Sequence, residues 1–389
     1  MQKSKEIIYF LPYIAGGVTS FVRNLLEFRP KSDIYYKVIF TRLKERMVDN
    51  FEINFNANEI IIFNFSEKEN LFSVFRRLKK HISSDNSFLV ANDGLELRMA
   101  NALKLKNPLI YIVHGNFDYY FRLAQNNHNI IDKIISVSNY LSKKLSEFVL
   151  KNNKIFTEYA PVTKIDNFEK NIFKTKIIIV FVGFITKLKG VLLFDEICKK
   201  LLAKNIIFEL NIIGDGDLFH KVKYQLIKHQ NVKLIGQVQH NKVIEFLKKS
   251  DILLFPTYAE GMPVAVVEAM KCGCVPVVSD IPSGIPEIVF DGKTGFKIKI
   301  GDTDGFANAI EYLYKNPQDM LDMSLNCQKL ANEMFDPYKQ AEKYEKLILS
   351  TTIENKIFEK KSLGRILNKP YLPNFLVKTI RSIIKNPKL

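Results

Sequence analysis

Short β-branched runs alternate with helix-compatible stretches through most of this chain, and that alternation limits the folds open to it. In the first half we expect strands at residues 7–11, 36–40, 59–63, 88–90, 109–113 and 134–137. Helices are expected between them, at 18–27, 71–81, 95–104 and 139–151. Strands and helices in this order form βαβ units, so the pattern predicts a parallel sheet covered by helices.

The alternation stops once and then starts again, which predicts two domains. Residues 161–174 break the pattern and are interpreted as the connection. Further strands are expected near 176–182, 207–213, 232–235, 252–255 and 274–278, and helices from about 303 to 350. The 389 residues suit two domains of roughly 100–200 residues each. We therefore expect two Rossmann-like domains, at 1–165 and 166–350, followed by a tail at 351–389.

The stretch 252–280 carries two carboxylates in a specific setting. Residues 252–255 suit a buried strand, Pro263 suits the first turn of a helix, and Gly273 suits its end. Glu260 is then expected on the loop at the carboxyl end of a strand, where open α/β sheets bind ligands. Glu268 is expected about two turns into the helix.

The backbone amides at the start of that helix could hold phosphate oxygens or sugar hydroxyls. One carboxylate beside a sugar, one beside a ribose and amides between them would make a site for a nucleotide sugar.

These residues resemble the Glu-x7-Glu signature of retaining glycosyltransferases with the GT-B fold, in particular glycosyltransferase family 4. Residues 181–190 resemble that family's Gly-Arg-x4-Lys-Gly segment, and residues 212–217 resemble its Gly-x-Gly turn. Gly16 and Gly17 resemble its amino-terminal glycine loop, and His114 resembles its histidine at a strand end. The match is dense from about 175 to 300 and thin elsewhere.

The resemblance implies a GT-B fold, in which two doubly wound domains face a central cleft. It implies transfer of a sugar, with retention, from a UDP- or GDP-sugar to a glycan or lipid-linked acceptor in bacterial cell-surface polysaccharide or glycolipid synthesis. The nucleotide sugar would be a co-substrate, and no cofactor or metal is expected. In such enzymes the last helix commonly returns to the first domain, as the tail would here.

The resemblance also assigns roles. Lys189 matches the pyrophosphate-binding lysine, and His114 would contact the donor sugar or polarise the reacting centre. Glu260 would face the hydroxyls of the sugar, and Glu268 would accept two hydrogen bonds from the ribose. The further donor-binding residues are expected to be Gly16, Gly17, Gly183, Lys187, Gly214, Gly261, Met262, Pro263 and Val264. Each role has a structural alternative: Lys189 would be a surface lysine, His114 a hydrogen-bonding core histidine, and Gly16 and Gly17 a plain strand-to-helix turn.

One position departs from the family. Phe184 stands where the family has an arginine, so a bidentate phosphate donor is lost unless Lys187 replaces it. This departure favours a second hypothesis, a nucleotide-sugar-binding homologue with weak or no turnover. Asp215 and Asp217 look like a metal-binding Asp-x-Asp pair, but they lie in the Gly-x-Gly turn and more simply shape a loop. Asp302 and Asp304 are expected to cap a helix.

The charge of the chain is strongly basic. Lys and Arg number 57 against 41 Asp and Glu, giving a net charge of +16. The segment 351–389 alone has nine Lys and Arg against two Glu. Such a balance suits an anionic lipid surface or nucleic acid, or is only a solvated face. A third hypothesis is therefore a transferase acting on nucleic acid, although no recognition helix or basic-aromatic interleaving supports a nucleic-acid partner.

The tail suggests a contact with lipid. Pro370 and Pro373 interrupt it, so only residues 374–385 could form one basic amphipathic helix. No run of about 18 apolar residues predicts a membrane span, and residues 7–15 read as a first strand rather than a signal peptide. The four cysteines show no disulfide framework. We expect a cytoplasmic protein, with peripheral attachment to the inner face of the membrane as the further hypothesis.

Overall fold

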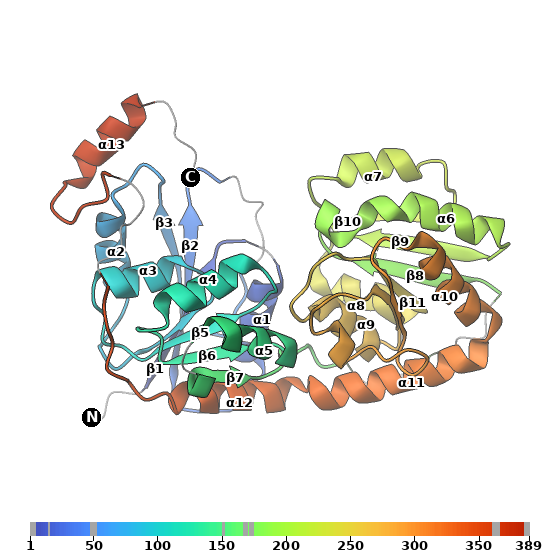
Figure 1. Ribbon diagram of the computed structural model, residues 1–389, viewed down its shortest axis with the longest axis horizontal. Coiled ribbons are helices and arrows are strands. Elements are labelled where there is room, and N and C mark those ends of the chain that lie inside the picture. The colour runs from blue at the N-terminus through green and yellow to red at the C-terminus, as the bar shows by residue number, and fades with distance from the viewer. Residues whose placement is uncertain are drawn as a thin grey trace. The chain divides into compact units, whose positions relative to one another are not determined.

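The computed structural model describes residues 5–14, 16–46, 53–149, 152–165, 170, 175–359 and 366–384. The chain divides into two compact units (Figure 1). The first unit consists of Met1–Val137, Ser142–Glu158 and Tyr338–Leu389, and the second of Ser138–Leu141 and Tyr159–Pro337. Most of the predicted connection, at 166–169 and 171–174, lies outside the described residues.

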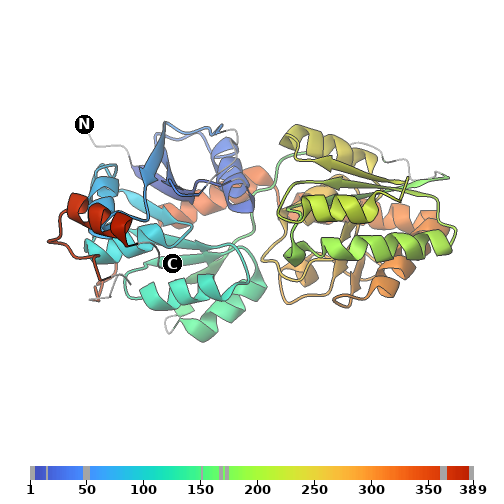
Figure 2. The same ribbon diagram turned by 90° about the horizontal axis from the view of Figure 1, so that it is seen from above.

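In the first unit, the described residues form a seven-stranded parallel sheet in the order β3-β2-β1-β4-β5-β6-β7. Its strands are β1 (Glu6–Pro12), β2 (Tyr35–Leu43), β3 (Glu59–Phe65), β4 (Phe88–Ala91), β5 (Leu109–Val113), β6 (Lys133–Ser136) and β7 (Ile155–Thr157). The central strands β1, β4 and β5 are buried along nearly their whole length, as expected where helices cover both faces (Figure 2). The strand order reverses between β1 and β4, which is a topological switch point.

The helices of this sheet are α1 (Gly17–Glu27), α2 (Leu71–Lys79), α3 (Leu95–Ala102), α4 (Asp118–Asn127) and α5 (Asn139–Phe148). Local chemistry explains some of their boundaries. The side chain of Asn70 caps α2 by accepting a hydrogen bond of 3.1 Å from the amide of Phe72. The sequence had not predicted α4 or β7.

The second unit has a six-stranded parallel sheet among its described residues, in the order β10-β9-β8-β11-β12-β13. Its strands are β8 (Ile177–Val182), β9 (Phe208–Ile213), β10 (Val232–Gly236), β11 (Ile252–Phe255), β12 (Val275–Ser279) and β13 (Phe296–Ile298). The order reverses between β8 and β11, so this sheet also has a switch point. The strand β13 had not been predicted.

The longer helices of the second unit are α6 (Phe194–Ala203), α7 (Phe219–Leu226), α8 (His240–Lys249), α9 (Val264–Lys271), α10 (Thr303–Lys315) and α11 (Pro317–Met334). Asp302 caps α10, because its Oδ1 accepts a hydrogen bond of 2.9 Å from the amide of Gly305. The predicted capping role of this aspartate is confirmed.

The last two helices belong with the first unit. They are α12 (Pro337–Leu349) and α13 (Asn374–Ile383). In α12, the hydroxyl of Tyr344 donates to the carbonyl of Glu158 at 2.6 Å. The carbonyl of Leu347, also in α12, accepts a hydrogen bond of 2.6 Å from the ammonium of Lys133 in β6. The first unit is thus built from both ends of the chain. In the part of the chain that the structure describes, no helix is long and apolar enough to cross a membrane.

Candidate active site

The switch point of the second sheet brings two loops together. One follows β8 and contains the single-turn helix η2 (Lys187–Lys189), and the other follows β11. The carbonyl of Leu188 accepts a hydrogen bond from the amide of Tyr258 at 2.8 Å, and the hydroxyl oxygen of Thr257 lies 3.2 Å from the same carbonyl. Both loops therefore have a fixed position at the carboxyl edge of the sheet, where such folds bind ligands.

Lys189 and Glu260 form an ion pair between these loops. Nζ of Lys189 donates to Oε1 of Glu260, and their side chains are only 19% and 11% exposed. The hydroxyl of Thr257 donates to the same carboxylate oxygen at 3.0 Å. Nζ of Lys189 also lies 5.3 Å from the centroid of the Phe255 ring. The pair places one cation and one carboxylate in direct contact at the sheet edge.

Two glycines allow the loops to approach so closely. Gly190 ends η2 with a φ of 70°, and a Cβ there would lie 1.9 Å from the carbonyl oxygen of Pro256. Gly214 follows β9 with a φ of 136°, and a Cβ there would lie 1.9 Å from the carbonyl oxygen of Gly183. Neither position can accept a side chain without moving its neighbour, so the glycines are required by packing as well as by backbone conformation.

The helix α9 begins beside Glu260. The carbonyl of Pro263 accepts the first helical hydrogen bonds, from Val266 at 3.0 Å and Val267 at 3.3 Å. The amides of Val264 and Ala265 precede those bonds, so they are the helix-start donors that a ligand could use. The sequence predicted Pro263 in the first turn, whereas the structure places it one residue earlier, as the cap. The preceding Met262 is buried, with 6% exposure.

Glu268 lies inside α9 with a side chain that is 8% exposed. Its Oε1 is 2.8 Å from Nε2 of His240, the first residue of α8. A contact to an imidazole orients the carboxylate and leaves Oε2 for another donor. His240 was not among the predicted site residues. No sequence motif links it to Glu268, because the contact arises only when α8 and α9 pack together.

In the first unit, His114 follows β5 and bonds to Asn92, which follows β4. Nε2 of His114 is 2.7 Å from Oδ1 of Asn92, while Nδ2 of Asn92 donates to the carbonyl of Phe10 at 2.9 Å. Because that assignment makes Oδ1 an acceptor, Nε2 carries the hydrogen and Nδ1 keeps its lone pair. Burial lowers the pKa of His114 to about 3, so the ring is neutral at physiological pH. A neutral ring of this tautomer can accept a hydrogen bond through Nδ1.

Acidic and aromatic side chains surround the same loop. Oε1 of Glu96 accepts hydrogen bonds from the amides of Asn92, at 2.8 Å, and Asp93, at 2.7 Å. Burial, together with the nearby charge of Asp93, raises the pKa of Glu96 to about 8. The hydroxyl of Tyr119 donates to Asp93 at 2.5 Å. The sequence analysis missed this cluster. The sequence did contain one signal for this cluster, the Asn92-Asp93-Gly94 turn directly after a buried strand.

Gly16 precedes α1 as its cap, and Gly17 is the first residue of that helix. A Cβ added to Gly17 would have no atom within 4 Å, so the space beside its backbone is open. In the second unit, Phe184 has a side chain that is 50% exposed, and Lys187 is exposed on η2. The loop next to them is shaped by Asp215, whose carbonyl accepts from the amide of Ile185 at 2.9 Å. Within the described ranges, no group of His, Cys, Asp or Glu side chains could hold a metal ion.

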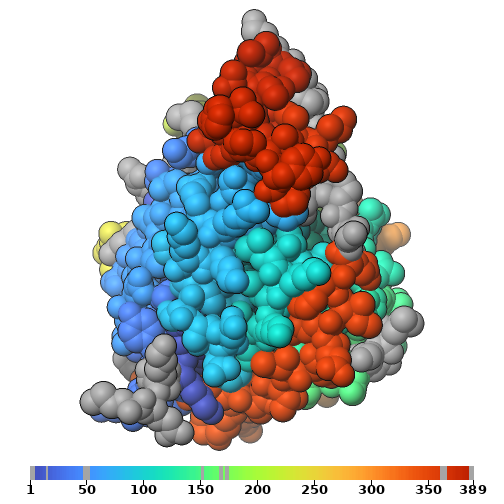
Figure 3. All heavy atoms as spheres, turned by 90° about the vertical axis from the view of Figure 1, so that its left-hand side faces the viewer, coloured from blue at the N-terminus to red at the C-terminus, as the bar shows by residue number. Residues whose placement is uncertain are grey.

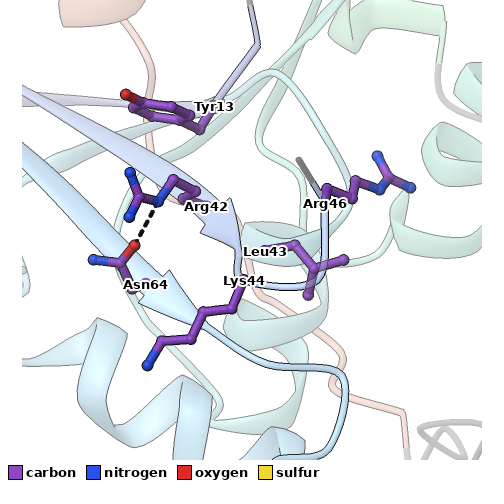
Figure 4. Close-up of a pocket in the computed structure, with 6 residues that line it drawn as sticks. All are labelled: Tyr13, Arg42, Leu43, Lys44, Arg46 and Asn64. Carbon is purple, nitrogen blue, oxygen red and sulfur yellow. Dashed lines mark hydrogen bonds between the residues drawn. The ribbon is translucent and has the colours of Figure 1, made fainter. Parts of the chain in front are cut away.

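A basic pocket lies at the carboxyl ends of β1, β2 and β3 (Figure 4). It has a volume of about 390 Å³ and is lined by Tyr13, Arg42, Leu43, Lys44, Arg46 and Asn64. The guanidinium of Arg42 lies 5.2 Å from the centroid of the Tyr13 ring and donates through Nε to Oδ1 of Asn64 at 2.8 Å. The neighbouring Glu45 instead bonds to Ser66 and to the amide of Glu67. Among the residues that the structure describes, three cations and no carboxylate line the pocket, which suits an anionic ligand.

Comparison with known proteins places the chain in a family. The profile of the family Glycosyl transferases group 1 matches residues 162–330. An uncharacterized glycosyltransferase of Methanocaldococcus jannaschii is 30% identical over 333 residues, which cover 80% of this chain and 88% of that protein. The UDP-Gal:alpha-D-GlcNAc-diphosphoundecaprenol alpha-1,3-galactosyltransferase of Escherichia coli is 28% identical over 231 residues, or 57% of this chain and 59% of that enzyme.

Solved structures agree on the fold. The crystal structure of Anabaena Alr3699/HepE in complex with UDP and glucose superposes with a TM-score of 0.70 at 16% identity, covering 89% of this chain and 100% of that one. The prediction of a GT-B fold, made of two parallel-sheet α/β domains, is confirmed. The chain therefore belongs to the group 1 glycosyltransferases and is itself a glycosyltransferase.

Proposed function

We propose that this glycosyltransferase takes its sugar from a nucleoside-diphosphate sugar held at the switch point of the second unit. One observation carries the proposal: the largely buried ion pair of Lys189 with Glu260, on the loop that leads to the first amides of α9. A departing nucleoside diphosphate develops negative charge on its phosphate oxygens. A fixed cation and a helix amino terminus are the groups that stabilise such a charge.

An exchange of partners would couple donor binding to catalysis. When a diphosphate arrives, its oxygens compete with Glu260 for the ammonium of Lys189. The released carboxylate, still oriented by the hydroxyl of Thr257 at 3.0 Å, then accepts hydrogen bonds from the donor sugar. Glu268, held by His240, would accept from the ribose through Oε2. Gly183, Gly214 and Gly261–Val264 would supply backbone contacts.

We propose that the reaction proceeds with retention. The acceptor hydroxyl would attack the face from which the diphosphate departs, and a departing phosphate oxygen would take its proton. The carbon–oxygen bond to phosphate breaks as the new glycosidic bond forms, and no enzyme nucleophile is required. His114 would accept a hydrogen bond from a substrate hydroxyl through Nδ1, because its pKa of about 3 keeps it from acting as a general acid. The turn of Gly16 and Gly17 would allow phosphate to approach, since the space beside the backbone of Gly17 is open.

We further propose an acceptor that carries phosphate, as a lipid-linked glycan does. The basic pocket around Arg42 supports this choice, since a phosphate would meet three cations there. The name of the Escherichia coli relative describes a diphosphoundecaprenol acceptor. Such an acceptor would place the enzyme at a membrane surface, in polysaccharide or glycolipid synthesis.

An alternative is a homologue that binds the nucleotide sugar with little turnover. It is favoured by Phe184, which occupies the position of the family arginine and exposes half of its side chain. The loss of a guanidinium would weaken stabilisation of the departing phosphate. The two proposals share a donor site and differ in whether sugar is transferred.

Thermal stability against UDP, GDP, ADP, CMP and their common sugars, with magnesium and with EDTA, tests both proposals. Saturation at 100 times the dissociation constant stabilises a protein by about 2.7 kcal/mol, a readily visible melting shift. We expect one nucleoside diphosphate to raise the melting temperature, independently of metal, and Lys189→Met to remove the shift. Lys176→Met, on an exposed lysine of the same unit, is the control. If no nucleotide raises the melting temperature of the wild-type protein, both proposals are contradicted.

Transfer is then tested with the stabilising donor and a polyprenyl-diphosphate glycan. Nuclear magnetic resonance of the product reports whether the anomeric configuration of the donor is kept. Inversion would refute the retaining mechanism, and binding without transfer would favour the low-turnover alternative.

A further inference from the structure

The helix α13 is attached to the first unit by its polar side. Asn374, Val377 and Arg381 share one face of the helix, since they are spaced by three and four residues. Oδ1 of Asn374 accepts from the amide of Asn70 at 2.9 Å, and Nη1 of Arg381 donates to the carbonyl of Glu67 at 3.2 Å. Only Val377, between them, is a buried apolar side chain of this helix.

The apolar stripe of α13 faces the other way. Leu376, Ile380 and Ile383 are also spaced by four and three residues, and they are 44%, 38% and 75% exposed. Phe375 beside them is 67% exposed. A helix on a globular protein normally turns its apolar stripe toward the core. Here the stripe points outward, and Figure 3 shows the red segment standing out from the surface of the first unit.

The segment leading into the helix has the same character. Ile366 and Tyr371 are 89% and 75% exposed. Exposed cations lie between these apolar side chains: Lys369 precedes the helix, and Lys378 within it contacts Glu69 at 3.3 Å. From 351 onward the sequence has nine Lys and Arg against two Glu. An outward apolar stripe among cations is complementary to one kind of surface, an anionic bilayer.

We propose that α13 docks the first unit on an anionic lipid bilayer. The helix lies in the plane of the interface, with Phe375, Leu376, Ile380 and Ile383 entering the boundary between headgroups and acyl chains. Lys369 and Lys378 remain at the level of the lipid phosphates, and Tyr371 lies at the interface, where tyrosine is favoured. The docking deepens the proposed function, because a lipid-linked acceptor is reached from that surface. It does not depend on the donor site.

Flotation with vesicles tests the docking. Wild-type protein should float with vesicles of phosphatidylcholine containing phosphatidylglycerol, and far less with phosphatidylcholine alone. The variant Phe375→Ser with Ile383→Ser should bind anionic vesicles at least about tenfold more weakly, because two large apolar side chains no longer leave water. The variant Lys369→Gln with Lys378→Gln should weaken binding several-fold, and the wild-type affinity should fall as salt rises.

A matched control lies on the second unit. Tyr224 and Ile227 are 83% and 76% exposed, so Tyr224→Ser with Ile227→Ser removes similar apolar surface from another helix end. We expect this control to float like the wild type. Circular dichroism and the nucleotide-dependent melting shift should be unchanged in all variants, since none of these residues is assigned to the donor site.

Several results would overturn the docking. The docking fails if the Phe375/Ile383 variant binds anionic vesicles as well as the wild type, or if the Tyr224/Ile227 control loses as much binding as that variant. It also fails if the wild type binds uncharged vesicles as tightly as anionic ones, or binds neither. A dimer in light scattering that the Phe375/Ile383 variant dissociates would show that a second copy covers the stripe instead. If vesicles bind as expected while no nucleotide shifts the melting temperature, the proposed donor site fails and the docking stands.

Discussion

Nε2 of His240 lies 2.8 Å from Oε1 of Glu268, joining the first residue of α8 to the interior of α9. The imidazole is 42% exposed and the carboxylate 8% exposed, so the histidine lies on the solvent side of the pair. It fixes one carboxylate oxygen and thereby orients the other. His240 is a positioning residue for the proposed ribose contact.

Replacing His240 by alanine should weaken nucleotide binding about fivefold to tenfold, because the carboxylate of Glu268 loses the hydrogen bond that orients it. Titration calorimetry with the nucleoside diphosphate that stabilises the wild type measures the effect. Glu268→Ala should weaken binding at least as much, and His220→Ala, at an exposed histidine of the same unit, should have no effect. An unchanged dissociation constant in His240→Ala would refute the positioning role.

Lys189→Met should lower the affinity for the nucleotide, whereas Glu260→Gln should lower kcat. Lys189→Met removes a charge-assisted contact to phosphate and should weaken nucleotide binding about tenfold to hundredfold. Glu260→Gln frees the ammonium, so nucleotide binding should be unchanged or tighter while kcat falls. Binding and turnover of both single variants and the double variant form the test. Equal losses of affinity in the two single variants would contradict the exchange of partners.

Gly190→Ala should destabilise the second unit by more than about 3 kcal/mol, since backbone strain adds to a clash with Pro256. Gly292 separates the two causes. It has the same φ of 70°, but a Cβ there would meet no atom within 4 Å. Gly292→Ala should therefore cost only the strain, about 1–2 kcal/mol. Calorimetric melting of both variants measures the difference, and equal shifts would show that the approach to Pro256 is not limiting.

Phe184→Arg should tighten binding of the nucleoside diphosphate roughly tenfold, because a guanidinium adds charge-assisted hydrogen bonds to phosphate. Phe184→Leu is the control for loss of the aromatic ring. If turnover rises together with affinity, the phenylalanine limits activity in the wild type. An arginine variant that binds no better would show that the side chain does not reach the phosphates.

Acid should destabilise the first unit through His114. Its pKa is about 3 in the folded protein, whereas a histidine in the unfolded chain has its ordinary pKa of 6.5. Between these values the unfolded state binds one more proton, so stability falls as the pH drops below 6.5. The loss should be about 2 kcal/mol at pH 5. His114→Gln should flatten this part of the melting profile and His128→Gln should not. If the melting temperatures of the wild type and of His114→Gln fall in parallel as the pH drops, His114 is not the cause of the acid destabilisation.

Much of the fold follows from local pattern, and the exceptions have a physical cause. Buried parallel strands such as β5 are continuous apolar runs, so their position was predicted to the residue. The strands β7 and β13 have three residues each and exist through pairing, as Ile134 with Ile155 and Val277 with Phe296 show. The predicted 95–104 and 139–151 helices end earlier in the structure, at Ala102 and Phe148.

The candidate site also has parts that the local sequence predicts and parts that it does not. Spacing in the sequence indicated that Glu260 follows a strand and that Glu268 lies in a helix, because both depend on neighbouring residues. The contacts of Glu260 with Lys189 and of Glu268 with His240 join residues 71 and 28 positions apart and depend on packing. The amphipathic pattern of α13 was also visible in the sequence. Which of its faces would meet the protein was not, since polar bonds to residues 67–70, just before α2, decide it.

Tyr344 also decides when the first unit can be completed. Its ring is fully buried, 5.1 Å from the centroid of Phe21, and it comes more than 180 residues after Glu158, to which it bonds. During synthesis the amino-terminal sheet leaves the ribosome without this side chain, while the second unit emerges whole. Domains ordinarily fold in the order in which they are made. In this protein the unit whose synthesis begins first must wait for α12, and the second unit can be finished before α12 is made.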